Sequence, residues 1–376
     1  MSIVIDIHAL QTVPPSLINR DDTGAPKSAI LGGVPRQRVS SQSWKRAIRR
    51  YFEDNFDAQQ IGDRSKRLPE KIALRLEAAG LEQDEAIQRV YDLFKNVDRK
   101  IAFDKTNQND DPDDKPSPYP RTSYLLFLSQ QQIDRAVEEL LALDGEKPSK
   151  AAAKAILDTD HSVDMAMFGR MVADDAAYNV DASVQVAHAI GIHASTPDFD
   201  YFTAVDDLAE DGKETGAGMI GTVQMMSSTM YRYATINFEG LKKNLDSTDA
   251  ARLAVEHFIE AFVSSMPTGK INTFANQTLP ELVYVAVRDT RPVSLVNAFE
   301  VPVDAEKGVS RRKVAADRLA REARDLESVY GFKPLAAYVM GIGETADSFN
   351  EIAEKTTLQE LTQHINEVLG RVVGDH

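Results

Sequence analysis

Hydrophobic and polar residues follow a strand-like period at the start of the chain and a helical period soon after. Residues 2–8 carry isoleucine at every second position, which predicts a half-buried strand. An irregular stretch with several prolines and glycines continues to about Val39. Ser40 or Ser41 can then cap a helix that runs to about Phe52, because serine accepts hydrogen bonds from the free N–H groups of a helix start.

The middle of the chain is predicted to combine helices with short strands. Residues 65–98 have a helical period with a stop at Gly80. Residues 107–118 lack apolar side chains and are expected to form a mobile loop. An apolar run at 122–129 predicts a buried strand, and a helix over 131–143 follows it. A helix rich in lysine and alanine comes next.

The second half of the chain shows no regular alternation of strands and helices. Residues 163–171 are expected to form a strand and residues 183–190 a helix. The segment 192–226 is rich in Asp, Gly and Thr, and strands return at 230–238 and 281–288. Because the chain also lacks an internal repeat, the predicted fold class is α+β.

The composition narrows the class of protein. The chain has 376 residues, of which 43% are hydrophobic and none is cysteine, so we expect a globular protein without disulfides or thiolate metal ligands. The first residues lack the basic lead of a signal peptide. No apolar run reaches the ~20 residues that span a bilayer. The prediction is a soluble, cytoplasmic protein without membrane attachment.

Charge is distributed unevenly along the chain. The formal net charge of −15 argues, as an average, against phosphate binding. Residues 23–52, however, contain no Asp or Glu. Their cations are Lys27, Arg36, Arg38, Lys45, Arg46, Arg49 and Arg50. This segregation is typical of a localised anion-binding face, and a solvated basic helix has the same pattern.

The predicted helix after Ser41 separates apolar from basic side chains. Its apolar stripe, expected to face the core, consists of Trp44, Ala47, Ile48 and Tyr51. Lys45 and Arg49 lie one turn apart on an adjoining face, with Arg46 and Arg50 beside them. A serine-rich helix start backed by cations favours binding of a phosphate without base selectivity. The alternative is an ordinary capped helix, and these residues alone leave both open.

Several motifs in a fixed order resemble one known family. They are the string from Asn19 to Arg50, GRM at 169–171, AHAI at 187–190, YFTAVDDL at 201–208, YRYATINF at 231–238 and VNAFE at 296–300. Together they resemble the repeating backbone subunit (CasC family) of the type I-E CRISPR Cascade complex, over most of the chain. This sequence departs from the familiar pattern at Trp44, which is bulkier, and at Tyr201, which stands where tryptophan is usual.

The resemblance implies a hand-shaped protein. Its palm is a modified RNA-recognition-motif (ferredoxin-like) fold made of residues 1–52, 161–191 and 227–376, the last with C-terminal elements. Residues 53–160 are a helical fingers insertion. Residues 192–226 are a protruding thumb hairpin. The first part of the palm then includes the basic segment.

The resemblance also implies which residues contact RNA. The phosphate-binding set is Lys27, Ser40, Gln42, Lys45 and Arg49, with Arg20 beside the RNA path and Arg46 on the same basic face. Met171, next to Arg170, packs against a base at a kink. The thumb contacts with nucleotides are Tyr201, Phe202, Thr203 and Ile220. Such side chains suit sequence-tolerant stacking, worth ~1–3 kcal/mol per base. From the residues alone, Met171 and Tyr201 are more typical of a core position and a loop anchor.

The implied function is that of a non-catalytic subunit that needs no cofactor or metal. Several copies bind along one CRISPR RNA, which reads target DNA by base pairing. The expected partners are CRISPR RNA, target DNA, other copies of the chain and the remaining Cascade subunits. Those subunits are the cap of the RNA 5′ end, the RNA-processing subunit at the 3′ end, and the small and large subunits. The whole is an antiviral ribonucleoprotein complex.

Two other interpretations of the sequence stay open. Asp21–Asp22 and Asp206–Asp207 are paired carboxylates that could hold Mg²⁺, so a metal-dependent nuclease is the alternative function. A scaffold that binds no nucleic acid fits the acidity but leaves the basic segment unexplained. The string GAGMIG at 216–221 matches a dinucleotide fingerprint, but it lacks the strand before it and the helix after it.

Overall fold

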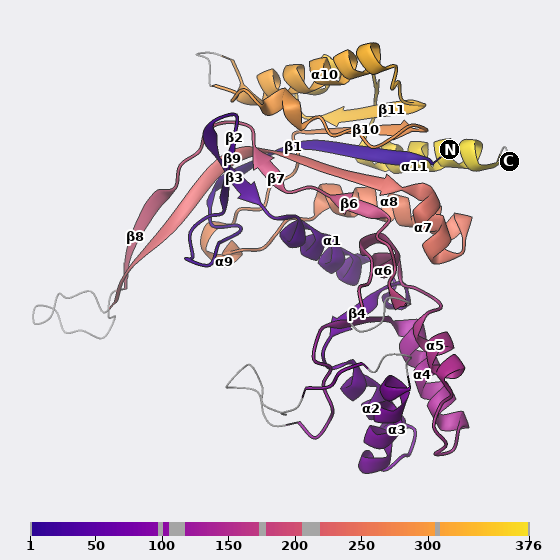
Figure 1. Cartoon of the computed structure of the whole chain (residues 1–376). Helices are drawn as coiled ribbons and strands as arrows, with labels where there is room; N and C mark the ends of the chain where they lie inside the picture. Colours follow the sequence, from indigo (N-terminus) through magenta and orange to yellow (C-terminus); the bar gives the residue numbers. More distant parts are fainter. Residues whose placement is uncertain are drawn as a thin grey trace, which may run out of the picture. The chain divides into compact units, whose positions relative to one another are not determined.

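The structure is a computed structural model that describes residues 2–96, 101–104, 117–172, 178–204, 219–304 and 309–374. The chain divides into two compact units. The first comprises Met1–Tyr51, Gln185–Asn237 and Val255–His376, and the second comprises Phe52–Val184 and Phe238–Ala254. Helices accompany a mixed sheet (Figure 1), which confirms the predicted α+β class.

The first unit is built around one large sheet with strand order β12-β11-β10-β1-β9-β7-β3-β2, and β6 and β8 each pair with β9. The strands are β1 (Val4–Ser16), β2 (Ser28–Leu31), β3 (Val34–Val39), β6 (Val184–Val186), β7 (Ala189–Gly191), β8 (Asp198–Ala204), β9 (Met219–Asn237), β10 (Leu282–Arg288), β11 (Ala336–Gly341) and β12 (Glu354–Lys355). Strand β1 pairs antiparallel with β9 and β10, so that His8 lies opposite both Tyr233 and Tyr284. Strands β11 and β12 are parallel, which makes the sheet mixed.

Strand β1 is buried on both faces, so the prediction of a half-buried strand is wrong. Every residue from Ile3 to Leu10 is buried. On one face, helix α10 (Arg311–Tyr330) packs through Leu319 and neighbouring alanines. On the other face lies helix α8 (Thr248–Ser264), whose Phe262 carbonyl accepts a hydrogen bond from Arg232 of β9. The alternation of isoleucines alone does not reveal this second covering layer. Polar residues in the same strand, Asp6 and His8, are buried as well.

Buried polar groups of β1 form hydrogen bonds with neighbouring residues, although Nε2 of His8 has no partner in the described part of the chain. Asp6 lies 3.2 Å from Nε of Arg288 and accepts a hydrogen bond of 2.9 Å from the Tyr233 hydroxyl. His8 Nδ1 lies 2.9 Å from the Tyr231 hydroxyl. Burial lowers the pKa of His8 to about 3, so its ring is neutral. His8 is therefore a structural residue of the core.

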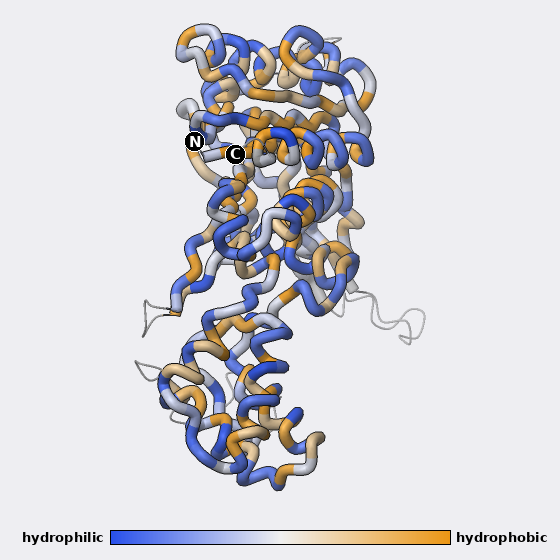
Figure 2. Tube along the Cα trace, turned by 90° about the vertical axis from the view of Figure 1, so that its right-hand side faces the viewer, coloured by the Kyte–Doolittle hydropathy of each residue, from blue (hydrophilic) through white to orange (hydrophobic). Residues whose placement is uncertain are grey.

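The second unit contains the helices α2 (Leu68–Ala78), α3 (Gln83–Lys95), α4 (Gln130–Ala142), α5 (Lys150–Leu157), α6 (Val163–Phe168) and α7 (Phe238–Leu245), with strands β4 (Gly62–Ser65) and β5 (Leu126–Ser129). Hydrophobic and hydrophilic residues alternate along the helices of this unit (Figure 2), and the buried apolar residues of α2, α3, α4 and α5 form a core of their own. The predicted stop at Gly80 is confirmed, because α2 ends at Ala78 and Gly80 has a φ of +104°. Ser129 and Gln132 form a capping box at the start of α4.

Two predicted elements have the opposite type. Residues 163–171 were expected as a strand, but Val163–Phe168 is helix α6, which ends where Gly169 has a φ of +79°. Residues 183–190 were expected as a helix, but they contain strands β6 and β7, which pair with β9. Short apolar runs do not distinguish a buried strand from a buried helix by period alone. In the second case, pairing to β9 decides the outcome.

The remaining elements of the chain are helices α1 (Ser41–Asn55), α9 (Ile271–Phe274) and α11 (Leu358–Gly374), with short 3-10 turns η1 (Ala58–Gln60), η3 (Val296–Phe299) and η4 (Ala346–Phe349). Residues 107–116 of the predicted mobile loop lie outside the described residues. Residues 161–184, placed with the palm by the resemblance, lie in the second unit. Palm, fingers and thumb stay predictions. Among the described helices, none is long and apolar enough to cross a membrane.

Candidate nucleic-acid interface

Helix α1 begins at a serine cap. The Ser40 carbonyl accepts hydrogen bonds from N–H of Ser43 at 3.1 Å and of Trp44 at 3.2 Å, and its hydroxyl lies 3.3 Å from the Ser43 nitrogen. Its own N–H donates to the Asn19 side chain at 2.9 Å. Ser40 is thus the cap residue and is nearly buried. Its position fixes where the basic face of α1 starts.

The inner face of α1 agrees with the predicted apolar stripe. Trp44 and Ile48 are buried, whereas Ala47 and Tyr51 are partly buried. Trp44 belongs to the core cluster that β1, β3 and β9 share. The Tyr51 hydroxyl donates to the Glu260 carboxylate at 2.7 Å. These contacts hold α1 against the sheet in one orientation.

The outer face of α1 carries the cations. Gln42, Arg46 and Arg50 are exposed, and Lys45 and Arg49 are partly buried. Burial lowers the pKa of Lys45 from the usual value of a lysine. The structure therefore brings the predicted residues Gln42, Lys45, Arg46 and Arg49 together on one helix. The arrangement suits an anion that runs along the helix.

Arg36 is the exception within the basic segment. It is completely buried, and its guanidinium donates to the carbonyls of Gly191 and Phe299 at 3.1 Å each. A further bond of 3.1 Å reaches the Glu300 carbonyl. Arg36 therefore joins the β2–β3 hairpin to the rest of the first unit, and its charge belongs to the interior. Counting charges along the sequence does not separate such a residue from a surface cation.

Lys27 lies on the β2–β3 side of α1, together with two basic residues absent from the predicted set. The Lys27 carbonyl accepts the backbone N–H of Arg38 at 2.9 Å. Nη1 of Arg38 lies 3.1 Å from Nδ1 of His188, and the Ser41 backbone nitrogen lies 3.4 Å from the same atom. Because residues 183–190 were predicted to form a helix, His188 was not expected beside Arg38 and Ser41. Pairing of β3 with β7, in which Val39 lies opposite Ala189, would have revealed it.

The loop before β2 places Arg20 and Asp21. Arg20 is exposed and forms an isolated bridge with Pro26. The Asp21 carboxylate accepts hydrogen bonds from Thr23 and Ala25. The hydrogen bond from the Thr23 hydroxyl is the main cause that lowers the pKa of Asp21. Asp21 therefore closes a turn.

The second predicted acidic pair, Asp206–Asp207, lies outside the described residues. Within the described ranges, no group of three or more His, Asp or Glu side chains is placed to hold a metal ion. The geometry of Asp21 is explained by its turn. The alternative of a metal-dependent nuclease therefore gains no support.

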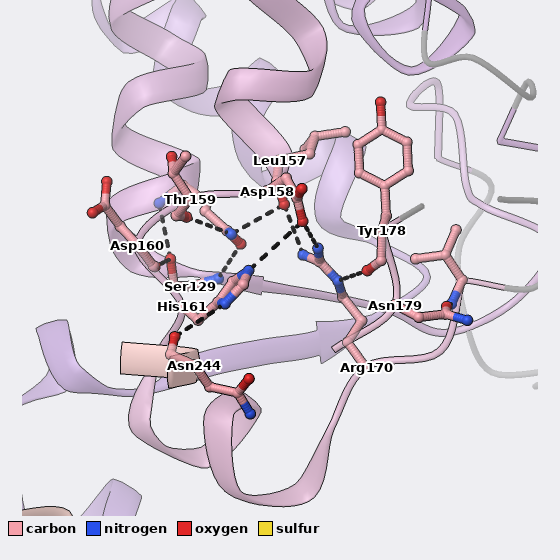
Figure 3. Close-up of polar contacts among 12 residues, drawn as sticks. Ser129, Leu157, Asp158, Thr159, Asp160, His161, Arg170, Tyr178, Asn179 and Asn244 are labelled. Atoms are coloured by element: carbon pink, nitrogen blue, oxygen red, sulfur yellow. Dashed lines mark hydrogen bonds and ion pairs between the residues drawn. The ribbon is translucent and has the colours of Figure 1, made fainter. Parts of the chain in front are cut away.

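Arg170 and Met171 have opposite exposure. Arg170 is 5% exposed, and its guanidinium donates to the carbonyls of Tyr178 at 2.9 Å and Leu157 at 2.8 Å (Figure 3). It also lies 3.4 Å from the Asp158 carboxylate, and burial lowers its pKa to about 10. The guanidinium is therefore engaged with neighbours in the second unit, and a contact of Arg170 with RNA stays a prediction.

The backbone around Met171 is held on both sides. Arg170 and Val180 exchange two backbone hydrogen bonds, of 3.0 and 2.8 Å. N–H of Val172 donates to the Asn179 side chain at 2.7 Å. Met171 itself is 78% exposed. The exposed side chain of Met171 thus projects from a backbone that is held on both sides.

Strands β8 and β9 form the hairpin that holds the predicted thumb residues. Tyr201 is 63% exposed and pairs with Thr222, and Thr203 pairs with Ile220. Phe202 lies opposite Gly221, and a Cβ at that glycine would lie 2.3 Å from its ring. The side chain of Ile220 is outside the described atoms.

Phe199 is an exposed aromatic residue that the sequence interpretation did not include. It is 68% exposed and lies two residues before Tyr201 in β8. Because side chains alternate along a strand, Phe199 and Tyr201 share one face of the hairpin. This alternation of side chains along the strand is the sequence signal that could have identified Phe199.

Comparison with known proteins covers nearly the whole chain. A profile of the CT1975-like protein family matches residues 5–364. The chain belongs to this family. No curated protein matches this CT1975-like chain.

Two solved structures resemble this CT1975-like protein along almost its full length. One, described as "CRISPR RNA-guided surveillance complex, pre-nicking", has 32% identity and a TM-score of 0.82, and covers 97% of this chain and 100% of that chain. The other, "CRISPR RNA-guided surveillance complex", has 29% identity and a TM-score of 0.73, and covers 96% and 99%. The resemblance drawn from the motifs is thereby confirmed.

Proposed function

We propose that this CT1975-like protein is the non-catalytic, RNA-binding backbone subunit of a type I-E CRISPR RNA-guided surveillance complex. The observation that carries the proposal is the basic outer face of α1, in a chain that matches chains of such complexes over almost its whole length. Lys45 and Arg49, with Arg46 and Gln42, bind successive phosphates of one CRISPR RNA. Binding is sequence-tolerant, because phosphate contacts carry no base information.

The exposed apolar residues supply the contacts to bases. Met171 packs against a base at a kink in the RNA. Tyr201 and Phe202, on the β8–β9 hairpin, contact nucleotides. Several copies bind along one RNA, in the cytoplasm, together with the subunits at both RNA ends and the small and large subunits. The RNA then reads target DNA by pairing.

Co-expression with a CRISPR array and the other subunits tests the proposal. The complex is purified by size exclusion and its RNA is extracted, for the wild type and for Lys45→Ala/Arg49→Ala. A matched control, Lys355→Ala/Arg371→Ala, removes the same charge from exposed residues of β12 and α11. One discrete RNA with the wild type and the control, lost in the α1 variant, supports guide binding by α1. Equal recovery from all three places the RNA path elsewhere, and RNA from none contradicts the proposal.

A further inference from the structure

We propose that Lys27, Arg38 and His188 form a separate phosphate subsite next to α1, which takes one phosphodiester group of the single-stranded RNA. The inference rests on the proposed function and adds a contact to it. The three residues come from the loop before β2, from β3 and from the segment between β6 and β7. The fold, and not their spacing in the sequence, brings them together.

The subsite is a cluster of basic groups. Within the described part of the chain, neither Lys27 nor Arg38 forms an ion pair with a carboxylate, although most basic residues of the second unit do. The positive charges of Arg38 and Lys27 both lower the pKa of His188, after the larger effect of burial. Basic groups held together in this way repel one another, and an anion between them relieves that repulsion.

His188 orients the arginine. Its Nδ1 accepts a hydrogen bond of 3.1 Å from Nη1 of Arg38, while Nε of Arg38 donates to the Ser28 carbonyl at 3.4 Å. With Nδ1 used as acceptor, the neutral imidazole carries its proton on Nε2, which is a donor on an exposed side chain. The Nη2 group of Arg38, the ammonium of Lys27 and Nε2–H of His188 are then three donors suited to phosphate oxygens.

The position continues the basic face of α1. The Ser41 backbone nitrogen lies 3.4 Å from Nδ1 of His188. Lys45 lies one helical turn after Ser41, so the two positions share a side of α1. An RNA strand that follows Lys45 and Arg49 therefore reaches His188 at the start of the helix. This continuity favours RNA over an unrelated acidic ligand.

Salt-dependent RNA release from the purified complex tests the subsite. For single strands, the slope of log affinity against log salt concentration becomes shallower by about 0.7 for each phosphate that the protein no longer neutralises. We expect Arg38→Gln to make the salt slope shallower by this amount for each subunit. We also expect the affinity for RNA to fall about tenfold, the usual effect of losing one hydrogen bond to a charged group. His188→Ala lowers affinity too. His188→Asn, which keeps an acceptor near the Nδ1 position, restores part of the affinity. Arg291→Gln, an exposed arginine elsewhere, serves as the control.

The outcomes separate the two proposals. If Lys45→Ala/Arg49→Ala loses RNA while Arg38→Gln and His188→Ala keep wild-type affinity and slope, the subsite is wrong and the proposed function stands. If Lys45→Ala/Arg49→Ala, Arg38→Gln and His188→Ala all keep wild-type affinity and slope, the RNA path lies elsewhere and the subsite is wrong, whereas absence of RNA from the wild-type complex contradicts the proposed function itself. A measurement on unmodified protein avoids any folding defect. Ring signals of His188 in histidine-labelled protein are expected to shift on addition of a short oligouridylate, and no shift at saturation would overturn the subsite.

Discussion

The ring of Trp44 lies over the guanidinium of Arg232, with 3.7 Å between the ring centre and the guanidinium carbon. Phe262 covers the same guanidinium at 4.2 Å. Arg232 is 2% exposed, and its hydrogen bonds go to the Gln11 side chain and the Phe262 carbonyl. Burial lowers its pKa to about 9, so it remains charged at neutral pH. Helix α1 therefore packs on a buried cation that aromatic faces and neutral dipoles stabilise.

Replacement of Trp44 is expected to destabilise the packing of α1 against the sheet. Trp44→Ala removes a fully buried ring and leaves a cavity above Arg232, which lowers the free energy of unfolding by about 3–5 kcal/mol. Trp44→Phe keeps an aromatic face and costs less. Circular dichroism during urea unfolding measures the difference. Equal stability of the two variants would mean that an aromatic ring at this position stabilises the fold no more than a methyl group does.

The case of α1 shows what the sequence could predict. Its cap, its apolar stripe and its basic face follow from residue types at a helical period, and all are present in the structure. The burial of Arg36 could not be predicted in the same way. Its burial depends on carbonyls of Gly191 and Phe299, which are distant in the sequence. A local pattern does not carry that information.

The segment containing His188 was predicted wrongly for a related reason. A run of six to eight mostly apolar residues fits a helix or a strand, and only pairing with β9 and β3 selects the strand. The exposure of Met171 is likewise a tertiary property. Its neighbours Arg170 and Val172 are buried, and their bonds to Tyr178 and Asn179 decide which side chain faces outward. Those bonds join residues seven and eight positions apart, and the hydrophobic pattern does not reveal them.

Two arginines of the basic segment are expected to respond differently to substitution. Arg46→Gln removes an exposed cation, so stability changes by no more than about 0.5 kcal/mol while the affinity for RNA falls. Arg36→Gln leaves buried carbonyls without donors, which costs about 1–3 kcal/mol for each unsatisfied group. Thermal unfolding and salt-dependent RNA release, measured on both variants, separate the effects. A stable Arg36→Gln protein with weakened RNA binding would contradict the assignment of Arg36 to the interior.

Arg170 and Met171 form a second contrasting pair. Met171→Ala is expected to leave stability within about 0.5 kcal/mol, because the side chain is exposed. It weakens RNA binding by up to ~1–3 kcal/mol per displaced base. Arg170→Ala instead destabilises the second unit, because it removes the donors to Leu157 and Tyr178. Urea unfolding together with RNA recovery checks both. Normal stability of Arg170→Ala combined with a reduced salt slope would indicate a direct phosphate contact after all.

Gly221 controls the position of Phe202 on the β8–β9 hairpin. A Cβ at residue 221 would lie 2.3 Å from the far end of the Phe202 ring, so Gly221→Ala pushes the ring aside. Because that ring is partly exposed, we expect little change in stability. RNA recovery in the assembled complex should fall in Gly221→Ala as it does in Phe202→Ala. Serine in place of Thr222, the next residue along β9, is the control. Wild-type recovery from Gly221→Ala with loss from Phe202→Ala would mean that the ring tolerates displacement.

Stability of the protein is expected to decrease as the pH falls below neutral, in part because of His8. Its pKa is lowered to about 3 in the folded chain, whereas an exposed histidine titrates near 6.5. Between these values the unfolded chain binds a proton that the folded chain does not, so acid favours unfolding, by up to about 1.4 kcal/mol per pH unit. Burial lowers the pKa of His161 and His193 in the same direction. His8→Asn, which keeps an acceptor for the Tyr231 hydroxyl, should therefore reduce the pH dependence of the unfolding free energy between pH 6 and pH 4 without abolishing it. An unchanged pH dependence would show that His8 becomes protonated within the folded sheet.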